Sequence, residues 1–147
     1  MIYLDAAYIG KCYLNEPGAE EVQDLARRAD GLTSCEIARL EFCSLVHRHL
    51  REGNITPSEA RQVWKEFEQD EADGVWRWLP LTSPLIRQIC GRVKTLPRDA
   101  FLRALDALHL ESARENGYRE VYTNDRHMLR AAPLFGIEGV DVTRKSR

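Results

Sequence analysis

Short apolar runs alternate with longer segments of helical periodicity along the whole chain. The apolar runs predict strands at residues 1–5, 31–34, 75–81, 120–123 and 139–142. Apolar positions with helical spacing lie between them, over residues 6–14, 17–29, 35–52, 56–71, 83–95 and 99–116, and a short helix follows Asp125. Strands that alternate with helices are typical of an α/β fold. We therefore expect a three-layer α/β/α sandwich around a mainly parallel sheet of four or five short strands.

Several of the predicted helices carry start signals. Thr56 precedes a proline and is followed three residues later by Glu59, which predicts a reciprocal capping box. Thr33 and Glu36 have the same spacing before the segment 35–52 and predict a second capping box there. Pro17 stands where the second helix is expected to open.

The composition is that of an ordinary globular protein. Its 147 residues suit one domain spanning 1–147, with 44% apolar and 30% charged residues. The 21 Lys and Arg nearly balance 23 Asp and Glu, so any contact with nucleic acid needs a local basic patch. The first residues lack the pattern of an export signal, and no run is long enough to cross a membrane, which makes the cytoplasm the expected location. The four cysteines lack zinc-site spacing and are expected to be reduced, buried thiols.

Two acids follow strands. Asp5 comes directly after Ile2-Tyr3-Leu4, and Asp125 follows the strand at 120–123. In open parallel sheets, ligands bind at the carboxyl ends of the strands. Each acid is also well placed to cap the helix that follows it, so the position of either one alone leaves both interpretations open.

Two further acids interrupt apolar helix faces. Glu41 lies one turn from both Ile37 and Leu45, and Asp106 stands within the leucine-rich stretch LRALDALHL. A lone glutamate at such a position is more simply a boundary residue that reaches water. Aspartate is too short to do so easily. Glu36 competes with Glu41, but its capping position accounts for it.

The four acids are more informative together than singly. Carboxylates drawn into one site repel one another and lose hydration, which is unfavourable without a cation. Hard oxygen ligands suit Mg²⁺ or Mn²⁺, whereas zinc usually recruits His or Cys. Such an ion can activate a water molecule and offset charge on a phosphodiester.

Four stretches that contain these acids resemble a known family. MIYLDAAYIG, LTSCEIARLE, LRALDALHLESA and VYTNDRHMLRAA are similar to the acidic motifs of PIN-domain ribonucleases, above all the VapC-type toxins of toxin–antitoxin pairs. The resemblance implies that Asp5, Asp106 and Asp125 bind the metal directly and that Glu41 binds it directly or through water. It implies that Thr123 orients a metal-bound water or ligand and that Arg103 contacts phosphate. Asp99 is interpreted as a helix cap rather than a fifth site acid.

The same resemblance implies a Mg²⁺- or Mn²⁺-dependent endoribonuclease that leaves a 5′-phosphate and a 3′-hydroxyl. Such a protein is expected to form a homodimer and to be neutralised by a small antitoxin. The alternative is a catalytically inactive PIN-like module that binds RNA or protein. A haloacid-dehalogenase-like phosphatase is disfavoured because Ala7 stands where a second Asp is needed, and a receiver-like domain lacks its paired acids.

Other features have simpler interpretations. The histidines at 47, 49, 109 and 127 lack the spacing of a zinc site, and we interpret His109 as packed or hydrogen-bonded. Trp76 and Trp78 alternate with Arg77, which predicts both rings on one buried strand face. The basic tail, 143–147, is interpreted as a solvated terminus.

Overall fold

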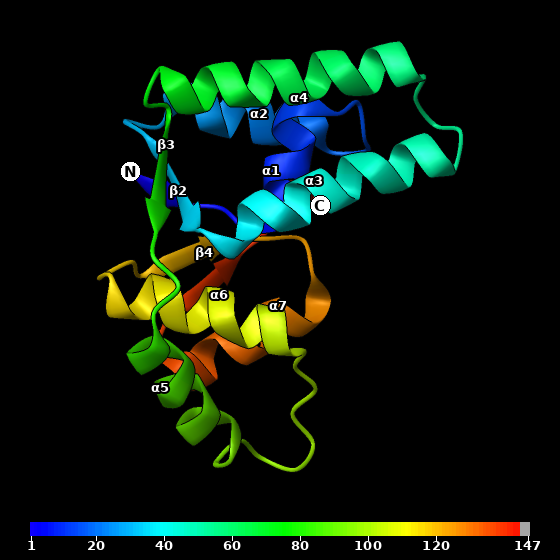
Figure 1. The fold of residues 1–147 in the computed structure, drawn as a ribbon. Helices are drawn as coiled ribbons and strands as arrows, with labels where there is room; N and C mark the ends of the chain where they lie inside the picture. Colours follow the sequence, from blue (N-terminus) through cyan, green and yellow to red (C-terminus); the bar gives the residue numbers. More distant parts are fainter. Residues whose placement is uncertain (145–147) are drawn as a thin grey trace.

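A computed structural model describes residues 1–144 and shows short strands between two groups of helices (Figure 1). In chain order its elements are β1 (Ile2–Tyr3), α1 (Ala6–Tyr13), α2 (Ala19–Arg28), β2 (Leu32–Cys35), α3 (Ile37–Arg51), α4 (Pro57–Ala72), β3 (Trp76–Leu79), α5 (Ser83–Val93), α6 (Ala104–Glu115), β4 (Glu120–Tyr122), α7 (Arg126–Ala131), the 3₁₀ helix η1 (Ala132–Phe135) and β5 (Glu138–Val140).

The described strands all pair in parallel. β2 lies between β1 and β3, and β4 pairs with β5. A bridge from Leu4 to Tyr122 joins the two sets, which gives the spatial order β3-β2-β1-β4-β5. The chain moves outward from β1 to β3 and then returns to the other side of β1. The boundary between β1 and β4 is therefore the topological switch point of the sheet, where parallel α/β folds open a crevice.

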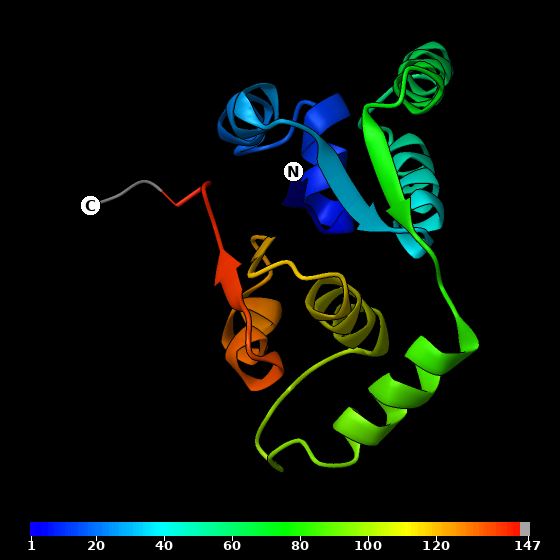
Figure 2. The ribbon, with the colours of Figure 1, turned by 90° about the vertical axis from the view of Figure 1, so that its left-hand side faces the viewer.

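Two hydrophobic cores lie on opposite faces of the strands. Leu4 belongs to the core formed with α1, α2, α3 and α4, whereas Tyr3 belongs to the core formed with α5, α6 and α7. Consecutive strand residues point to opposite faces, so β1 contributes to both cores. Figures 1 and 2 show the first four helices in the upper part of the molecule and the last three in the lower part. The predicted three-layer α/β/α sandwich with a parallel sheet is confirmed.

A glycine lets α1 approach α3 closely. A side-chain carbon at Gly10 would overlap Leu45 of α3. Glu41 lies one turn before Leu45, and Asp5 immediately precedes α1. The close packing therefore fixes two of the predicted site acids relative to one another.

Two local predictions agree with the structure. Thr56 and Glu59 form the reciprocal capping box at the start of α4. The rings of Trp76 and Trp78 stack with centroids 5.2 Å apart; Trp76 is part of the buried core, and the partly buried Trp78 packs against it.

The predicted starts of two earlier helices are wrong. Thr33 lies inside β2, paired with β1 and β3, and its hydroxyl accepts a hydrogen bond from Tyr118. Strand pairing therefore removes it as a cap. α3 starts at Ile37 with Glu36 as its N-cap residue, and Glu36 makes no capping hydrogen bond. α2 begins after Gly18, whose φ of 82° belongs to the left-handed region, so Pro17 lies outside the helix.

The helix that carries Asp106 also starts later than predicted. Asp99 caps no helix, because the chain stays irregular until Arg103 and α6 begins at Ala104. In this irregular segment the ring of Phe101 packs against His127, with centroids 4.2 Å apart. Tertiary contacts of the segment thus replace the helical turn that the sequence pattern predicts, and Leu102 precedes the helix rather than sharing its face.

The cysteines are free thiols, but their predicted burial is only partly correct. Cys35 is buried, whereas Cys43 and Cys90 are exposed. Within residues 1–144 no helix combines the length and hydropathy of a membrane span. Most of the predicted basic tail lies outside the described residues.

Candidate active site

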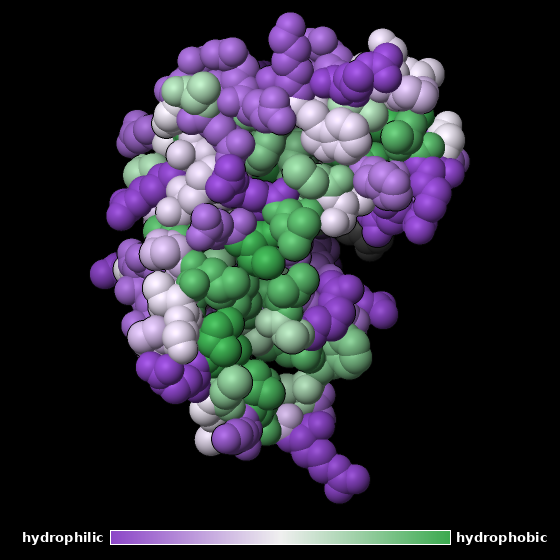
Figure 3. Space-filling model, in the orientation of Figure 1, coloured by the Kyte–Doolittle hydropathy of each residue, from purple (hydrophilic) through white to green (hydrophobic). Residues whose placement is uncertain are grey.

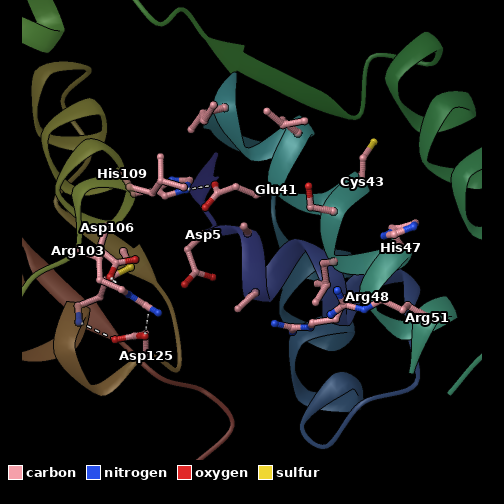
Figure 4. A pocket seen from close by; sticks show the side chains of 18 residues that line it. Asp5, Glu41, Cys43, His47, Arg48, Arg51, Arg103, Asp106, His109 and Asp125 are labelled. Atoms are coloured by element: carbon pink, nitrogen blue, oxygen red, sulfur yellow. Dashed lines mark hydrogen bonds and ion pairs between the residues drawn. The ribbon is translucent and has the colours of Figure 1, made fainter. Parts of the chain in front are cut away.

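A groove with a volume of about 920 Å³ opens beside the ends of β1 and β4, and residues of α1, α3, α6 and α7 line it. Its lining includes all four acids singled out in the sequence: Asp5, Glu41, Asp106 and Asp125. Figure 4 shows Asp5 between Glu41 on one side and Asp106 and Asp125 on the other. The groove lies at the switch point of the sheet, so topology gathers acids that are far apart in the sequence.

Asp5 is the most buried of the four, with 4% of its surface exposed. Its Oδ1 accepts a hydrogen bond from the Tyr8 amide at 2.9 Å and caps α1, as the sequence allowed. Its Oδ2 accepts a hydrogen bond from the Thr123 hydroxyl at the end of β4. Burial raises the pKa of Asp5 to about 6, and the nearby Glu41 carboxylate adds to the rise, although both hydrogen bonds oppose it.

Glu41 is held by a buried chain of hydrogen bonds. Its Oε2 lies 2.7 Å from Nε2 of His109, whose Nδ1 lies 2.9 Å from the Tyr3 hydroxyl. That hydroxyl accepts the Cys35 amide hydrogen at 3.1 Å. Burial raises the pKa of Tyr3, so its hydroxyl keeps its proton and donates it to Nδ1. With Nδ1 as the acceptor, the hydrogen of the His109 ring lies on Nε2, which donates it to Glu41.

Arg103 holds the other two acids together. Its Nε lies 2.8 Å from Oδ2 of Asp106, and its Nη2 lies 2.6 Å from Oδ2 of Asp125. Asp125 also caps α7, since its Oδ1 accepts the amide hydrogens of His127 and Met128. One guanidinium therefore lies between two carboxylates that belong to different helices (Figure 4).

The opposite end of the groove is basic. His47, Arg48 and Arg51 line it from the last turns of α3. Figure 4 shows them along that helix, away from the acids. The groove thus has an acidic end and a basic wall, which is a charge pattern suited to a metal ion and a polyanion lying side by side.

The acid set fits a hard divalent cation by its chemistry. Carboxylate oxygens are the ligands that Mg²⁺ and Mn²⁺ prefer, and the Arg103 guanidinium already stands as a cation between two of them. In residues 1–144, however, no three His, Cys, Asp or Glu side chains converge closely enough to hold an ion. Each acid is instead held by a protein hydrogen bond donor.

The structure gathers the predicted site residues but also reveals partners that the sequence did not indicate. Thr123 contacts Asp5, and Arg103 contacts two acids rather than standing free. Glu36 is absent from the lining of the groove. His109 is hydrogen-bonded as interpreted, but its bond to Glu41 was missed. Its place one turn after Asp106, on the same helix, was the available signal.

Chemically, this groove offers buried carboxylates, hydrogen bond donors that orient them, and cationic side chains at hydrogen-bonding distance or along one wall. Such a set can bind a divalent cation and a phosphodiester together.

The PIN domain family model matches residues 2–134. Among solved structures, VapC20 of Mycobacterium tuberculosis, described as a Sarcin-Ricin loop cleaving toxin, superimposes with a TM-score of 0.69 at 16% identity, covering 89% of this chain and 95% of its own. FitAcB from Neisseria gonorrhoeae gives 0.70 at 19% identity, covering 97% and 98%. FitAB bound to an IR36 DNA fragment gives 0.69 at 18%, covering 100% and 99%. No match to a curated protein was found.

Proposed function

The chain belongs to the PIN domain family, and from this premise we propose that it is a Mg²⁺- or Mn²⁺-dependent endoribonuclease that acts as the toxin of a toxin–antitoxin pair in the cytoplasm. One observation carries the proposal. Four carboxylates from four separate parts of the chain line one groove at the switch point of the sheet. Such a concentration of negative charge, partly buried, is unfavourable unless cations offset it.

Asp5, Asp106 and Asp125 are the proposed direct ligands of the metal, and Glu41 binds it directly or through water. A bound divalent cation supplies Lewis-acid chemistry, lowering the pKa of water and offsetting charge on the phosphate. Thr123 orients the Asp5 carboxylate through its hydroxyl, and His109 orients Glu41. Arg103 lies at the acidic end, where its guanidinium can bind phosphate oxygens.

RNA is the proposed substrate. The feature of this chain that supports it is the basic wall of the groove, formed by His47, Arg48 and Arg51. Arg48 and Arg51 line the end of the groove opposite the acids and present charge to a sugar–phosphate backbone. Because the net charge of the chain is −2, the chain as a whole does not attract a polyanion, and binding of RNA depends on this local arrangement. VapC20, which shares the fold, is described as cleaving the Sarcin-Ricin loop.

The proposed partners are a small antitoxin protein and a second copy of this chain. The likeness in fold to FitAB and FitAcB supports the proposal of an antitoxin partner. For the homodimer, Figure 3 shows an apolar area that runs from the start of α3 down over α6 and α5. Leu40, Ile86 and Leu105 are exposed on these helices, and we call them the apolar strip. Exposed apolar areas of this kind mark protein interfaces.

Cleavage of RNA by the purified full chain tests the function. We expect cleavage with Mg²⁺ or Mn²⁺, its loss in EDTA, and a loss of at least about 100-fold in Asp106→Asn. Asp99→Asn is the matched control, because Asp99 is exposed and lies outside the groove. Cleavage that survives EDTA or Asp106→Asn would contradict the metal mechanism. RNA binding without cleavage under every metal condition would favour the inactive binding module.

A further inference from the structure

Arg103 occupies the place between Asp106 and Asp125 that a shared metal ion would need. Both of its contacts are short, at 2.8 and 2.6 Å, and both involve Oδ2 of the acid. Guanidinium and a divalent cation on the same oxygens would repel each other at a separation of a few ångströms. Arg103 and the metal therefore compete for the same carboxylates.

The hydrogen bonds of Asp125 show which contact must yield. Its Oδ1 accepts two amide hydrogens, from His127 and Met128, at 2.7 and 3.0 Å. Releasing Oδ1 would uncap α7 and leave two amides without their partner. Its Oδ2 is held by Arg103, whose side chain is 61% exposed and can return to water. Oδ2 is therefore the oxygen available to a cation, once the guanidinium has left.

Because of its position in the chain, the Arg103 side chain can move away from the two acids without disturbing α6. It is the N-cap residue of α6, has extended backbone angles, and makes no capping hydrogen bond with its side chain. Moving its guanidinium thus breaks two ion pairs and leaves the helix intact. Once the two acids are neutralised by a metal, the guanidinium stands beside the groove with its donors free for a phosphate, which it binds with matched geometry.

We propose that Arg103 is a resident counter-cation that a divalent metal displaces, and that the displaced guanidinium then binds the RNA phosphate. In the metal-free protein it keeps Asp106 and Asp125 together despite their repulsion. Metal binding frees it, so metal and RNA bind with positive cooperativity, and by linkage RNA raises the affinity for metal equally. This inference rests on the proposed metal site and adds the order in which its cations exchange.

Titration with Mn²⁺ in the absence of RNA tests the exchange, because it requires no activity. Calorimetry on the full chain compares wild type with Arg103→Ala, Arg103→Lys and a control, Arg98→Ala, which alters an exposed arginine outside the groove. We expect Arg103→Ala to bind Mn²⁺ about 2- to 10-fold more tightly, since the competitor is gone. Arg103→Lys should lie between, and Arg98→Ala should match wild type. Equal or weaker binding by Arg103→Ala would overturn the exchange.

A second measurement keeps the test valid if the alanine variant folds poorly. In wild type, the Nε–H resonance of Arg103, assigned by its loss in Arg103→Lys, should move toward the position of free arginine when Mg²⁺ is added. An unchanged resonance at saturating Mg²⁺ would overturn the exchange while leaving the metal site standing. If no variant binds Mn²⁺ or Mg²⁺, the proposed metal function itself fails, and the exchange fails with it.

Discussion

Asp5 combines three roles that usually fall to different residues. It caps α1, accepts a hydroxyl hydrogen from β4, and faces the groove. Burial raises its pKa from 3.8 to about 6, which means that the metal-free fold favours the protonated carboxyl more than the unfolded chain does. Its contribution to stability is therefore complete below pH 4 and is lost as the pH rises through 6.

Replacing the charge at this position should stabilise the metal-free protein. Asparagine in Asp5→Asn keeps one oxygen as acceptor for the Tyr8 amide and turns its NH2 toward the Thr123 hydroxyl, which then accepts rather than donates, and it carries no charge. We expect its free energy of unfolding to exceed that of wild type by up to about 3 kcal/mol at pH 7.5 in EDTA. Urea denaturation of both proteins measures this difference in the free energy of unfolding. The gain should vanish near pH 4, where Asp5 is neutral as well, and a loss at pH 7.5 would contradict the effect of burial.

The buried His109 should matter for metal binding rather than only for packing. His109→Ala removes the donor to Glu41, and we expect the affinity for Mn²⁺ to fall about 10-fold, as it does when partners of metal ligands are lost. His109→Gln keeps a side-chain N–H and should recover part of the loss. Leu110→Ala is the control: it removes a buried side chain of the same helix and should lower stability without changing metal affinity. Equal losses of affinity in both alanine variants would indicate a structural role.

The sequence singles out the four acids that line the groove, but it does not indicate their hydrogen-bonding partners. Carboxylates in apolar stripes and at strand ends are visible along the chain, and Glu41 and Asp125 are examples of each. The bond from His109 to Glu41 joins residues 68 positions apart. The ion pair from Arg103 to Asp125 depends on an irregular segment before α6. Contacts of this kind follow from three-dimensional packing, which no local pattern contains.

At the scale of elements, helix starts were predictable where local chemistry was the only constraint. The capping box of α4 is exposed and formed as predicted. Thr33 has the same sequence signal, but β2 lies between two strands and fixes it in the sheet. Tertiary pairing outweighs a cap that is worth about 1 kcal/mol.

A buried carboxylate on α6 forms an ion pair with α5. Glu111 has no exposed side-chain surface and accepts hydrogen bonds from Arg92 of α5 and Arg114 of α6. Burial opposes its ionisation, but the two arginines more than compensate and lower its pKa. The charge is thus tolerated only while its partners remain.

Removing the two arginines and removing the Glu111 carboxylate should have different effects on the free energy of unfolding. Arg92→Ala combined with Arg114→Ala leaves the Glu111 charge buried and unpaired, and we expect a loss of about 3–5 kcal/mol in the free energy of unfolding. Glu111→Met keeps the volume and removes the charge, and it should cost less than about 1.5 kcal/mol. Urea denaturation of both variants decides the matter. A methionine variant as unstable as the double arginine variant would show that the ion pairs are net stabilising.

At the scale of the whole molecule, the alternation of strands and helices was enough to predict the layers and the parallel sheet. The switch point followed only from the bridge between Leu4 and Tyr122, which places β4 beside β1. Strand order is not encoded in hydrophobic periodicity, because each short parallel strand has a similar apolar pattern.

The apolar strip predicts self-association. Leu40 is 64% exposed at the start of α3, so Leu40→Glu should leave the fold intact. We expect sedimentation velocity to show a dimer for wild type and a monomer for this variant, because an unpaired charge in an apolar interface is strongly unfavourable. Val75→Glu alters an exposed apolar residue outside the strip and should remain dimeric. A wild-type monomer at micromolar concentration would contradict the homodimer.

The hydrogen bond between Asp5 and Thr123 joins residues 118 positions apart. A growing chain therefore has its first site acid almost at once, but it lacks the hydroxyl that orients this acid until the fourth strand has been made. Chains that stop after Asp106 carry three of the four acids and still lack both β4 and Asp125. Synthesis from one end to the other thus delays the completed groove until nearly the whole chain exists.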